Sequence, residues 1–251
     1  MKKDAIVVSH LEKSFKVYPD KGSSLKEKLL FLKRNAYDRR QVLKDISFTV
    51  SPGEAVALIG RNGCGKSTLL KILTRIIYPD RGEVDIQGKV SSLIELGAGF
   101  HPDMTGRENI YVNASIFGLQ KKKIDERLSD IIAFSGLEDY MDVPVRTYSS
   151  GMYARLAFAV AIHVSAQVLL IDEILAVGDA AFQRRCFAKM EQLKREGTTI
   201  VLVSHSMEDV VRLCPRAIWI DGGLVRMDGP AQTVIGAYLA SAQEPGWGQG
   251  R

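Results

Sequence analysis

Short apolar runs alternate along the chain with longer amphipathic stretches, and glycine or polar residues separate them. Alternating apolar and β-branched residues predict strands at residues 5–17 and 42–50. A short apolar strand is expected at residues 54–60, followed by apolar residues at helical spacing from Leu69 to Ile76. Further strand-like segments are a hairpin-like EVDIQGKV and three apolar runs, VLLIDEILAV, TTIVLVSHS and RAIWIDGG. Apolar strands that alternate with helix-like sequence are typical of a buried parallel sheet, so the pattern predicts an α/β fold.

Two capping boxes mark helix starts. The box at residues 24–27 precedes leucines at helical spacing and predicts a short basic amphipathic helix at about residues 24–34. That helix lies in an insertion of about residues 22–40 between the first two strands. The second box, at residues 105–108, opens a helical region that extends to about residue 165.

Composition narrows the class of protein without naming a function. The 251 residues are 46% hydrophobic and 25% charged, which excludes a disordered or fibrous chain and suffices for one domain with its own core. The net charge of 34 − 29 = +5 favours anionic partners such as nucleotides, nucleic acids or lipid headgroups. The three cysteines share no C-x-x-C spacing, so neither a disulfide framework nor a zinc ribbon is expected. The N-terminus lacks a secretory apolar region, and the most apolar long stretch, residues 156–171, is too interrupted to cross a bilayer.

A phosphate-binding loop is predicted at GRNGCGKST, residues 60–68, which matches G-x-x-x-x-G-K-[ST] between a strand and a helix. Glycines let the backbone N–H groups turn toward phosphate oxygens, and the helix adds its positive N-terminal end. Lys66 would reach the β- and γ-phosphates, and the Ser67 hydroxyl would bind Mg²⁺. The nucleotide-binding residues expected in this loop are Gly60, Arg61, Asn62, Gly63, Cys64, Gly65, Lys66, Ser67 and Thr68.

Two carboxylates follow the apolar strand VLLIDE. Asp172 stands where a carboxylate beside a phosphate-binding loop meets Mg²⁺, and Glu173 follows it directly. A second carboxylate at the strand tip can orient or deprotonate an attacking water. The pair therefore predicts a nucleotide hydrolase.

The segment TYSSGMYARLAFAVA, residues 147–161, resembles the signature motif of ATP-binding cassette (ABC) ATPases. The order of motifs is also similar to that family: phosphate loop, signature at residues 148–152, Walker B strand at 168–173, D-loop at 176–179 and switch histidine at His205. The resemblance covers nearly the whole chain.

This resemblance implies a P-loop NTPase core with a mostly parallel sheet, an N-terminal antiparallel β subdomain and an inserted helical subdomain. A single ABC nucleotide-binding domain is expected over residues 1–240, followed by a flexible tail at 241–251. The RecA-like core would comprise about residues 1–92 and 166–240, and the helical subdomain about residues 93–165.

In the family, two subunits hold two ATP molecules head to tail, each signature motif facing the partner's nucleotide. The resemblance therefore assigns Ser149, Ser150 and Gly151 to ATP on a second copy, and Asp179 to communication between the two sites. It makes His205 a partner of the γ-phosphate that helps hold the water with Glu173, so that Lys66, Glu173 and His205 are the catalytic residues.

The resemblance also assigns two further positions, of which the first departs from the family pattern. Glu95 stands near the position of the Q-loop glutamine and would join Ser67 and Asp172 as a Mg²⁺ ligand. For the aromatic residue that stacks on adenine, Phe15 fits best and Tyr18 is a close alternative.

Four segments together resemble the ATPase subunits that export bacterial O antigens, capsules and teichoic acids. They are the basic insertion, ELGAGFHPDMTGRENI, YSSGM and DEILAVGDAAFQ. The resemblance implies ATP and Mg²⁺ as cofactors, a homodimer, and docking on two copies of an integral membrane permease at the cytoplasmic face of the bacterial inner membrane. A lipid-linked glycan would be the substrate. The insertion's basic residues Lys26, Lys28, Lys33 and Arg34 could meet lipid phosphates, or form a solvated charged face.

Other functions remain as alternatives. Import or drug efflux would use the same ATPase, and a nucleotide-switched nucleic-acid-binding protein would share its motifs. Repair relatives carry a long coiled coil and translation factors carry two cassettes, so no nucleic acid partner is expected. Because the chain stops soon after Leu239, an additional carbohydrate-reading domain is not expected. Cys64, inside the phosphate loop, is expected to make activity sensitive to thiol alkylation.

Overall fold

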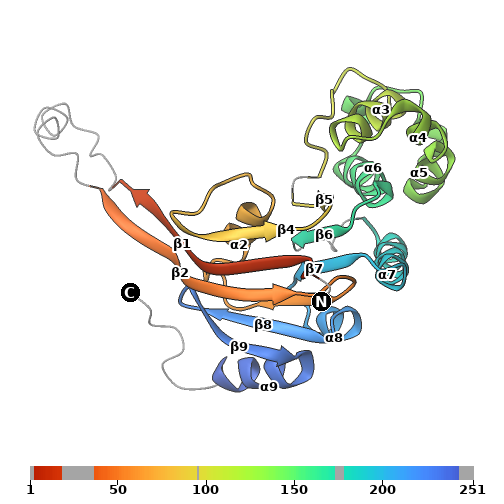
Figure 1. Cartoon of the computed structure of the whole chain (residues 1–251). Helices are drawn as coiled ribbons and strands as arrows, with labels where there is room; N and C mark the ends of the chain where they lie inside the picture. The colour runs from red at the N-terminus through yellow and green to blue at the C-terminus, as the bar shows by residue number, and fades with distance from the viewer. Residues whose placement is uncertain (1–2, 19–36, 95, 173–177, 243–251) are drawn as a thin grey trace, which may run out of the picture.

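The computed structural model describes residues 3–18, 37–94, 96–172 and 178–242, which form a nine-stranded sheet with helices on its faces and at one end (Figure 1). In chain order the strands are β1 (Ile6–Val17), β2 (Asp38–Val50), β3 (Ala55–Ile59), β4 (Arg81–Ile86), β5 (Val90–Ser92), β6 (Val168–Asp172), β7 (Thr199–Val203), β8 (Arg216–Asp221) and β9 (Leu224–Pro230). The helices are α2 (Lys66–Leu73), α3 (Gly106–Ile116), α4 (Lys121–Asp125), α5 (Leu128–Ser135), α6 (Ser150–His163), α7 (Ala180–Arg195), α8 (Met207–Leu213) and α9 (Ala231–Ala242), with 3-10 turns η1 (Glu138–Tyr140) and η2 (Val145–Thr147).

The sheet has a parallel half and an antiparallel half, in the order β4-β1-β2-β9-β8-β3-β7-β6-β5. Neighbours from β8 through β5 pair in parallel, as expected for strands connected by helices. At the other end β4, β1 and β2 pair antiparallel, and β9 joins the halves by pairing antiparallel with β8 and parallel with β2. The predicted mostly parallel α/β fold with an N-terminal antiparallel part is thus confirmed.

Two hydrophobic clusters cover the two faces of the parallel half. Val56 and Leu58 of β3 belong to a cluster that contains the apolar side of α2, whereas Ala57 and Ile59 belong to a cluster with α7, α8 and α9. This alternation along one strand places α2 on one face and the C-terminal helices on the other. The phosphate loop, which connects β3 to α2, therefore begins at the carboxyl end of a strand that is buried on both faces.

Helices α3, α4, α5 and α6 gather at one end of the molecule, away from β1 and β2 (Figure 1). They enclose a third hydrophobic cluster. Leu156 and Val160 of α6 belong to that cluster, whereas Phe158 and Ile162 of the same helix pack into the cluster beneath α7. Helix α6, which begins within the YSSGM segment, thereby joins the helical end to the sheet.

Three local expectations differ from the structure. Helix α2 ends at Leu73, and Arg75 adopts φ 60°, so Ile76 leaves the helix and is 48% exposed. The EVDIQGKV segment is not a hairpin: β4 pairs with β1 and β5 pairs with β6 at opposite ends of the sheet. Strand β9, which was not predicted, has alternating half-buried and exposed residues and therefore contains no fully apolar run.

Several expectations fall partly or wholly outside the described residues. The helix expected at 24–34, Glu95, Glu173 and most of the expected tail belong to this group. At the borders, residues 38–40 belong to β2 rather than to a helical insertion, and residues 241–242 complete α9. Among the helices that the structure describes, none is both long and apolar enough to cross a membrane.

Candidate functional site

Two glycines give the phosphate loop its shape. Gly60 has φ 148°, and a Cβ built there would lie 2.2 Å from the Ile220 carbonyl oxygen. Gly65 has φ 114°, is the N-cap of α2, and a Cβ there would lie 2.5 Å from Leu43 Cδ2. Since L side chains are disfavoured at such φ values, only glycine allows the backbone to pass this close to β8 and β2.

Lys66 is held at the centre of this loop. It is the first residue of α2, it is 5% exposed, and its ammonium donates hydrogen bonds to the Gly60 carbonyl at 2.7 Å and the Arg61 carbonyl at 3.0 Å. An ammonium carries three N–H bonds, and these carbonyls use two of them. The loop backbone therefore holds a buried cation inside the loop, and the adjoining start of α2 adds a helix dipole that favours an anion.

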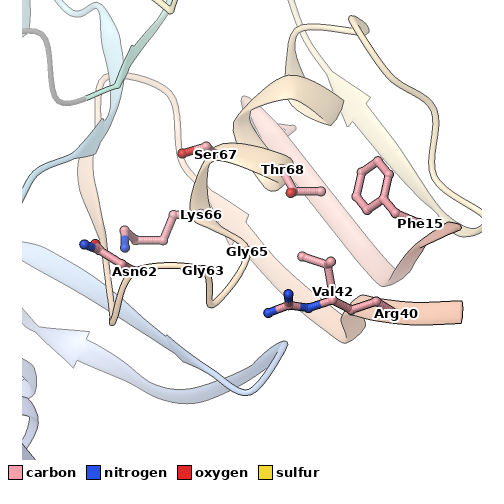
Figure 2. A pocket seen from close by; sticks show the side chains of 9 residues that line it. All are labelled: Phe15, Arg40, Val42, Asn62, Gly63, Gly65, Lys66, Ser67 and Thr68. Carbon is pink, nitrogen blue, oxygen red and sulfur yellow. The ribbon is translucent and has the colours of Figure 1, made fainter. Parts of the chain in front are cut away.

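A pocket of about 480 Å³ opens beside the loop (Figure 2). On one side lie the loop and the first turn of α2, and on the other lie side chains from β1 and β2. Its lining residues are Phe15, Arg40, Val42, Asn62, Gly63, Gly65, Lys66, Ser67 and Thr68. The pocket thus combines phosphate-binding groups with an aromatic and apolar wall, which suits a nucleotide.

The structure separates the two aromatic candidates for base stacking. Phe15 lies in the pocket wall, 39% exposed, and is the cross-strand partner of Arg40. Tyr18 does not line this pocket, and its ring packs at 6.0 Å from the ring of Tyr37. Sequence reasoning missed Arg40 and Val42; their signal was period-two spacing, which puts both on one face of β2.

The parallel strands bring the remaining groups to the same edge of the sheet. Leu58 of β3 and Asp172 of β6 are both register partners of Val203 of β7. Because the three strands run in parallel, their carboxyl ends meet, so the loop after β3, Asp172 and His205 share this edge. His205 is exposed just beyond β7, and Asp172 is half-buried at the last position of β6.

The donor set at this edge fits Mg²⁺. Ser67 presents an exposed hydroxyl in the first turn of α2, and Asp172 contributes a carboxylate from β6. Mg²⁺ keeps several waters and is usually bound by one or two carboxylates together with substrate phosphates. Within the described part of the chain, no group of three or more His, Cys, Asp or Glu side chains could hold a metal by itself.

The signature segment forms an exposed helix start. The Ser149 hydroxyl is the N-cap of α6 and accepts a hydrogen bond of 3.2 Å from the Met152 amide. Ser150 is exposed, and a Cβ at Gly151 would meet only Ser149 Oγ, at 3.9 Å. None of the three residues Ser149, Ser150 and Gly151 lines the pocket beside the phosphate loop.

Asp179 also caps a helix. Its carboxylate accepts a hydrogen bond of 2.8 Å from the Phe182 amide at the start of α7. That hydrogen bond is the main cause that holds the pKa of the Asp179 carboxyl below its usual range. Asp179 is exposed, so its charged carboxylate lies on the surface at the start of α7.

The structure argues against the expected reactivity of Cys64. Its side chain is 7% exposed, and burial raises the pKa of the thiol despite the nearby Lys66 ammonium. The thiolate is the form that reacts with alkylating reagents, and its population falls as the pKa rises. Alkylation of Cys64 in the folded chain is therefore expected to be slow.

The comparisons with known proteins agree with the resemblance to ABC ATPases. The family model described as "ABC transporter" matches residues 43–176. The chain is similar to the O-antigen export system ATP-binding protein RfbB of Klebsiella pneumoniae, at 46% identity over 92% of this chain and 95% of that protein. It is also similar to the teichoic acids export ATP-binding protein TagH of Listeria monocytogenes, at 39% identity over 91% of this chain and 68% of that protein.

A solved structure supports the fold. The model is similar to the dimeric structure of a post-hydrolysis state of an ATP-binding cassette bound to ADP and Pi. The TM-score is 0.72 at 20% identity, over 90% of this chain and 98% of that one.

Proposed function

Because this chain belongs to the ABC transporter family, we propose that it is the ATP-binding and ATP-hydrolysing subunit of an exporter of lipid-linked polysaccharide. The observation that carries the proposal is the pocket in which Lys66, Ser67 and the loop glycines face the aromatic wall of β1. The similarity to O-antigen and teichoic acid export proteins, which extends over nine-tenths of the chain, supports the type of substrate.

ATP binding would use each part of the pocket differently. Lys66 and the backbone amides of the loop bind the phosphates, because a buried cation and converging N–H groups offset the charge of the triphosphate. Phe15 offers its ring to the adenine, and Arg40 adds a cation on the adjacent strand. Ser67 and Asp172 would hold Mg²⁺, which supplies charge neutralisation on the phosphate oxygens when bound.

Hydrolysis needs a base and a γ-phosphate contact at the same sheet edge. Glu173 follows Asp172 in the chain and is proposed to orient and deprotonate the attacking water. His205, at the end of the adjacent strand β7, is proposed to donate a hydrogen bond to the γ-phosphate. Proximity of the two strand ends is the physical basis for pairing these roles.

We place the signature segment on the nucleotide of a second copy. Ser149 and Ser150 are exposed and Gly151 is half-buried, and none of the three lines the pocket in its own chain, which supports a contact between copies. Helix α6 would bring its dipole and its Ser149 hydroxyl to the partner's γ-phosphate. Two identical chains would then bury two ATP molecules in a head-to-tail homodimer.

The partners follow from the type of export system. The homodimer would dock on two copies of an integral membrane permease at the cytoplasmic face of the inner membrane and drive a lipid-linked O antigen, capsule or teichoic acid across it. The basic insertion between β1 and β2 carries Lys26, Lys28, Lys33 and Arg34, which are proposed to guide the lipid-linked phosphate.

Enzyme variants test the ATPase assignment. Lys66→Ala should weaken binding of Mg·ATP about tenfold or more, because charge-assisted hydrogen bonds to the phosphates are lost. Lys71→Ala, on the last turn of the same helix, is the matched control and should bind normally. Glu173→Gln should keep binding and lower turnover about a hundredfold or more. Turnover of Glu173→Gln at the wild-type rate would contradict the role of Glu173.

A deletion tests the export assignment. Removing the gene from its own organism should abolish the surface polysaccharide and leave lipid-linked glycan inside the cell. A plasmid with the wild-type gene should restore the surface polymer, and a plasmid with Glu173→Gln should not. Normal surface polysaccharide in the deletion strain would contradict polysaccharide export while leaving the ATPase assignment to the enzyme assay.

A further inference from the structure

Asp80 connects the end of the phosphate-binding helix to the strand that carries Phe15. It follows α2 in the chain and directly precedes the first residue of β4. One carboxylate oxygen accepts a hydrogen bond of 2.8 Å from the Ser14 amide, and the other accepts one of 3.0 Å from Lys13 Nζ. The Asp80 amide in turn donates to the Glu12 carbonyl at 2.8 Å.

The position of these contacts explains why a carboxylate is needed there. The β1-β4 ladder ends at the pair Glu12 and Arg81, although β1 continues to Val17. A strand beyond the end of its partner leaves backbone N–H groups without ladder partners. The Asp80 carboxylate satisfies the Ser14 N–H at this point and so replaces the missing strand backbone.

The same segment of β1 is irregular and carries the pocket wall. The β1-β2 register shifts between Leu11 and Lys13 and again between Lys13 and Ser14, just before Phe15. Such bulges re-aim the following side chain. Lys13 Nζ lies 5.6 Å from the centroid of the Phe15 ring, so the cation held by Asp80 also contacts the aromatic ring.

Burial and charge distinguish Asp80 from an ordinary surface carboxylate. The side chains of Lys13 and Asp80 are 16% and 29% exposed. The Lys13 hydrogen bond is the largest cause that lowers the pKa of Asp80, and the Arg39 guanidinium at 3.8 Å lowers it further. The carboxylate is thus held charged, with both of its oxygens in hydrogen bonds to β1.

We propose that Asp80 is a positioning residue for the nucleotide base: by fixing Lys13 and the Ser14 backbone it orients Phe15 toward the pocket (Figure 2). This inference rests on the proposed ATP-binding function and extends it. Lys66 begins α2 and Asp80 ends the segment that follows this helix, so the helix and that segment connect the phosphate site to the base wall.

The test compares a ligand that has a base with one that lacks it. Calorimetric titrations with Mg·ATP and with Mg·tripolyphosphate would be run on wild type, Asp80→Ala, Asp80→Asn and Phe15→Ala. Asp80→Ala should raise the dissociation constant for Mg·ATP about fivefold, the lower end of base–aromatic stacking. Binding of tripolyphosphate should stay within about twofold, since the phosphate loop is untouched.

The direction of the change in ligand affinity distinguishes a positioning role of Asp80 from an electrostatic one. Removing a carboxylate makes the site more positive, which would strengthen the binding of both anionic ligands. A loss confined to Mg·ATP therefore has no electrostatic origin. Asp80→Asn keeps an acceptor for the Ser14 amide and should restore most of the affinity. The matched control is Asp85→Ala, which removes a more exposed ion pair between β4 and Lys3. It should leave the dissociation constants of both ligands unchanged.

Coupling to Phe15 completes the experiment. Phe15→Ala combined with Asp80→Ala should bind Mg·ATP no more weakly than Phe15→Ala alone, because Asp80 acts through the ring. Additive losses, or equal losses for both ligands, would overturn the role of Asp80. Wild-type protein that binds neither ligand would instead contradict the proposed function.

Discussion

Gly60 and Gly63 lie in the same loop with positive φ values, yet they meet different surroundings. At Gly60 an added Cβ would collide with the Ile220 carbonyl and would also lie 2.8 Å from Cys64 Sγ. At Gly63 an added Cβ has nothing within 4 Å. Backbone conformation alone is unfavourable at Gly63, whereas at Gly60 the clash with β8 is added to it.

A pair of alanine substitutions tests this difference. Gly63→Ala should lower the free energy of unfolding by about 1 kcal/mol, the strain of a non-glycine residue at φ 76°. Gly60→Ala should lower it by about 3 kcal/mol or more and weaken Mg·ATP binding, since the loop must move away from β8. Urea denaturation and calorimetry would measure both. Equal effects at the two positions would contradict the packing of the loop against Ile220.

The buried thiols predict a pH dependence. Burial raises the pKa of Cys214 to about 12, above the 9.0 of an exposed thiol. The neutral thiol therefore contributes stability that is fully present below pH 9 and is lost as the pH rises toward 12. The difference in unfolding free energy between wild type and Cys214→Ala should shrink above pH 9, by at most ~1.4 kcal/mol per pH unit. A difference that is constant from pH 8 to 11 would contradict this account.

Single residues differed in how far the sequence predicted them. Lys66 and Ser67 could be assigned because the loop motif places them at the start of a helix, and they line the pocket. Arg40 was missed, because the period-two spacing that places it on one face of β2 does not show its cross-strand pairing with Phe15. The prediction that Cys64 is readily alkylated did not take its burial into account, because burial by tertiary packing cannot be read from a loop motif.

Among the helices, N-caps serve both stability and the site. Ser149 caps α6 and Thr105 caps α3, the latter in a complete capping box with Glu108. Both hydroxyls accept a backbone N–H that no other helical group would satisfy. They differ in position, because Thr105 belongs to no part of the proposed nucleotide site.

These two caps form a matched pair of variants. Ser149→Ala and Thr105→Ala should each lower the free energy of unfolding by about 1 kcal/mol, the usual cost of losing a cap. Only Ser149→Ala should also lower steady-state ATP turnover, because its hydroxyl is proposed to contact ATP on the second copy. Thermal melts and phosphate release would be compared. Similar turnover in the two variants would remove the signature role of Ser149.

Element boundaries were less predictable than element types. The apolar period continued to Ile76, but α2 stops at Leu73 because the following turn leads the chain back to β1. Segments 81–86 and 90–92 read as one hairpin, although their partners are β1 and β6. Local patterns predict which residues form strands, whereas the choice of partner depends on long-range packing.

Across the whole molecule, the parallel sheet concentrates the chemistry at one edge. Loop, Asp172 and His205 converge there because β3, β7 and β6 are neighbours that run the same way. The alternation of apolar strands with helices along the sequence was sufficient to predict this class of fold. The antiparallel part was predicted only from the family resemblance, because it depends on β4 reaching β1 from a distant position in the chain.

In the proposed homodimer, each copy of the chain completes the ATP site of the other. Sedimentation of the Glu173→Gln chain with Mg·ATP should give a particle of twice the 27.7 kDa chain mass, and without nucleotide a single chain. Adding Gly151→Leu should prevent the dimer yet preserve Mg·ATP binding, because Gly151 lines no part of the pocket in its own chain. A Gly151→Leu chain that still dimerises with ATP would contradict the claim, as would one that loses ATP binding as fully as Lys66→Ala.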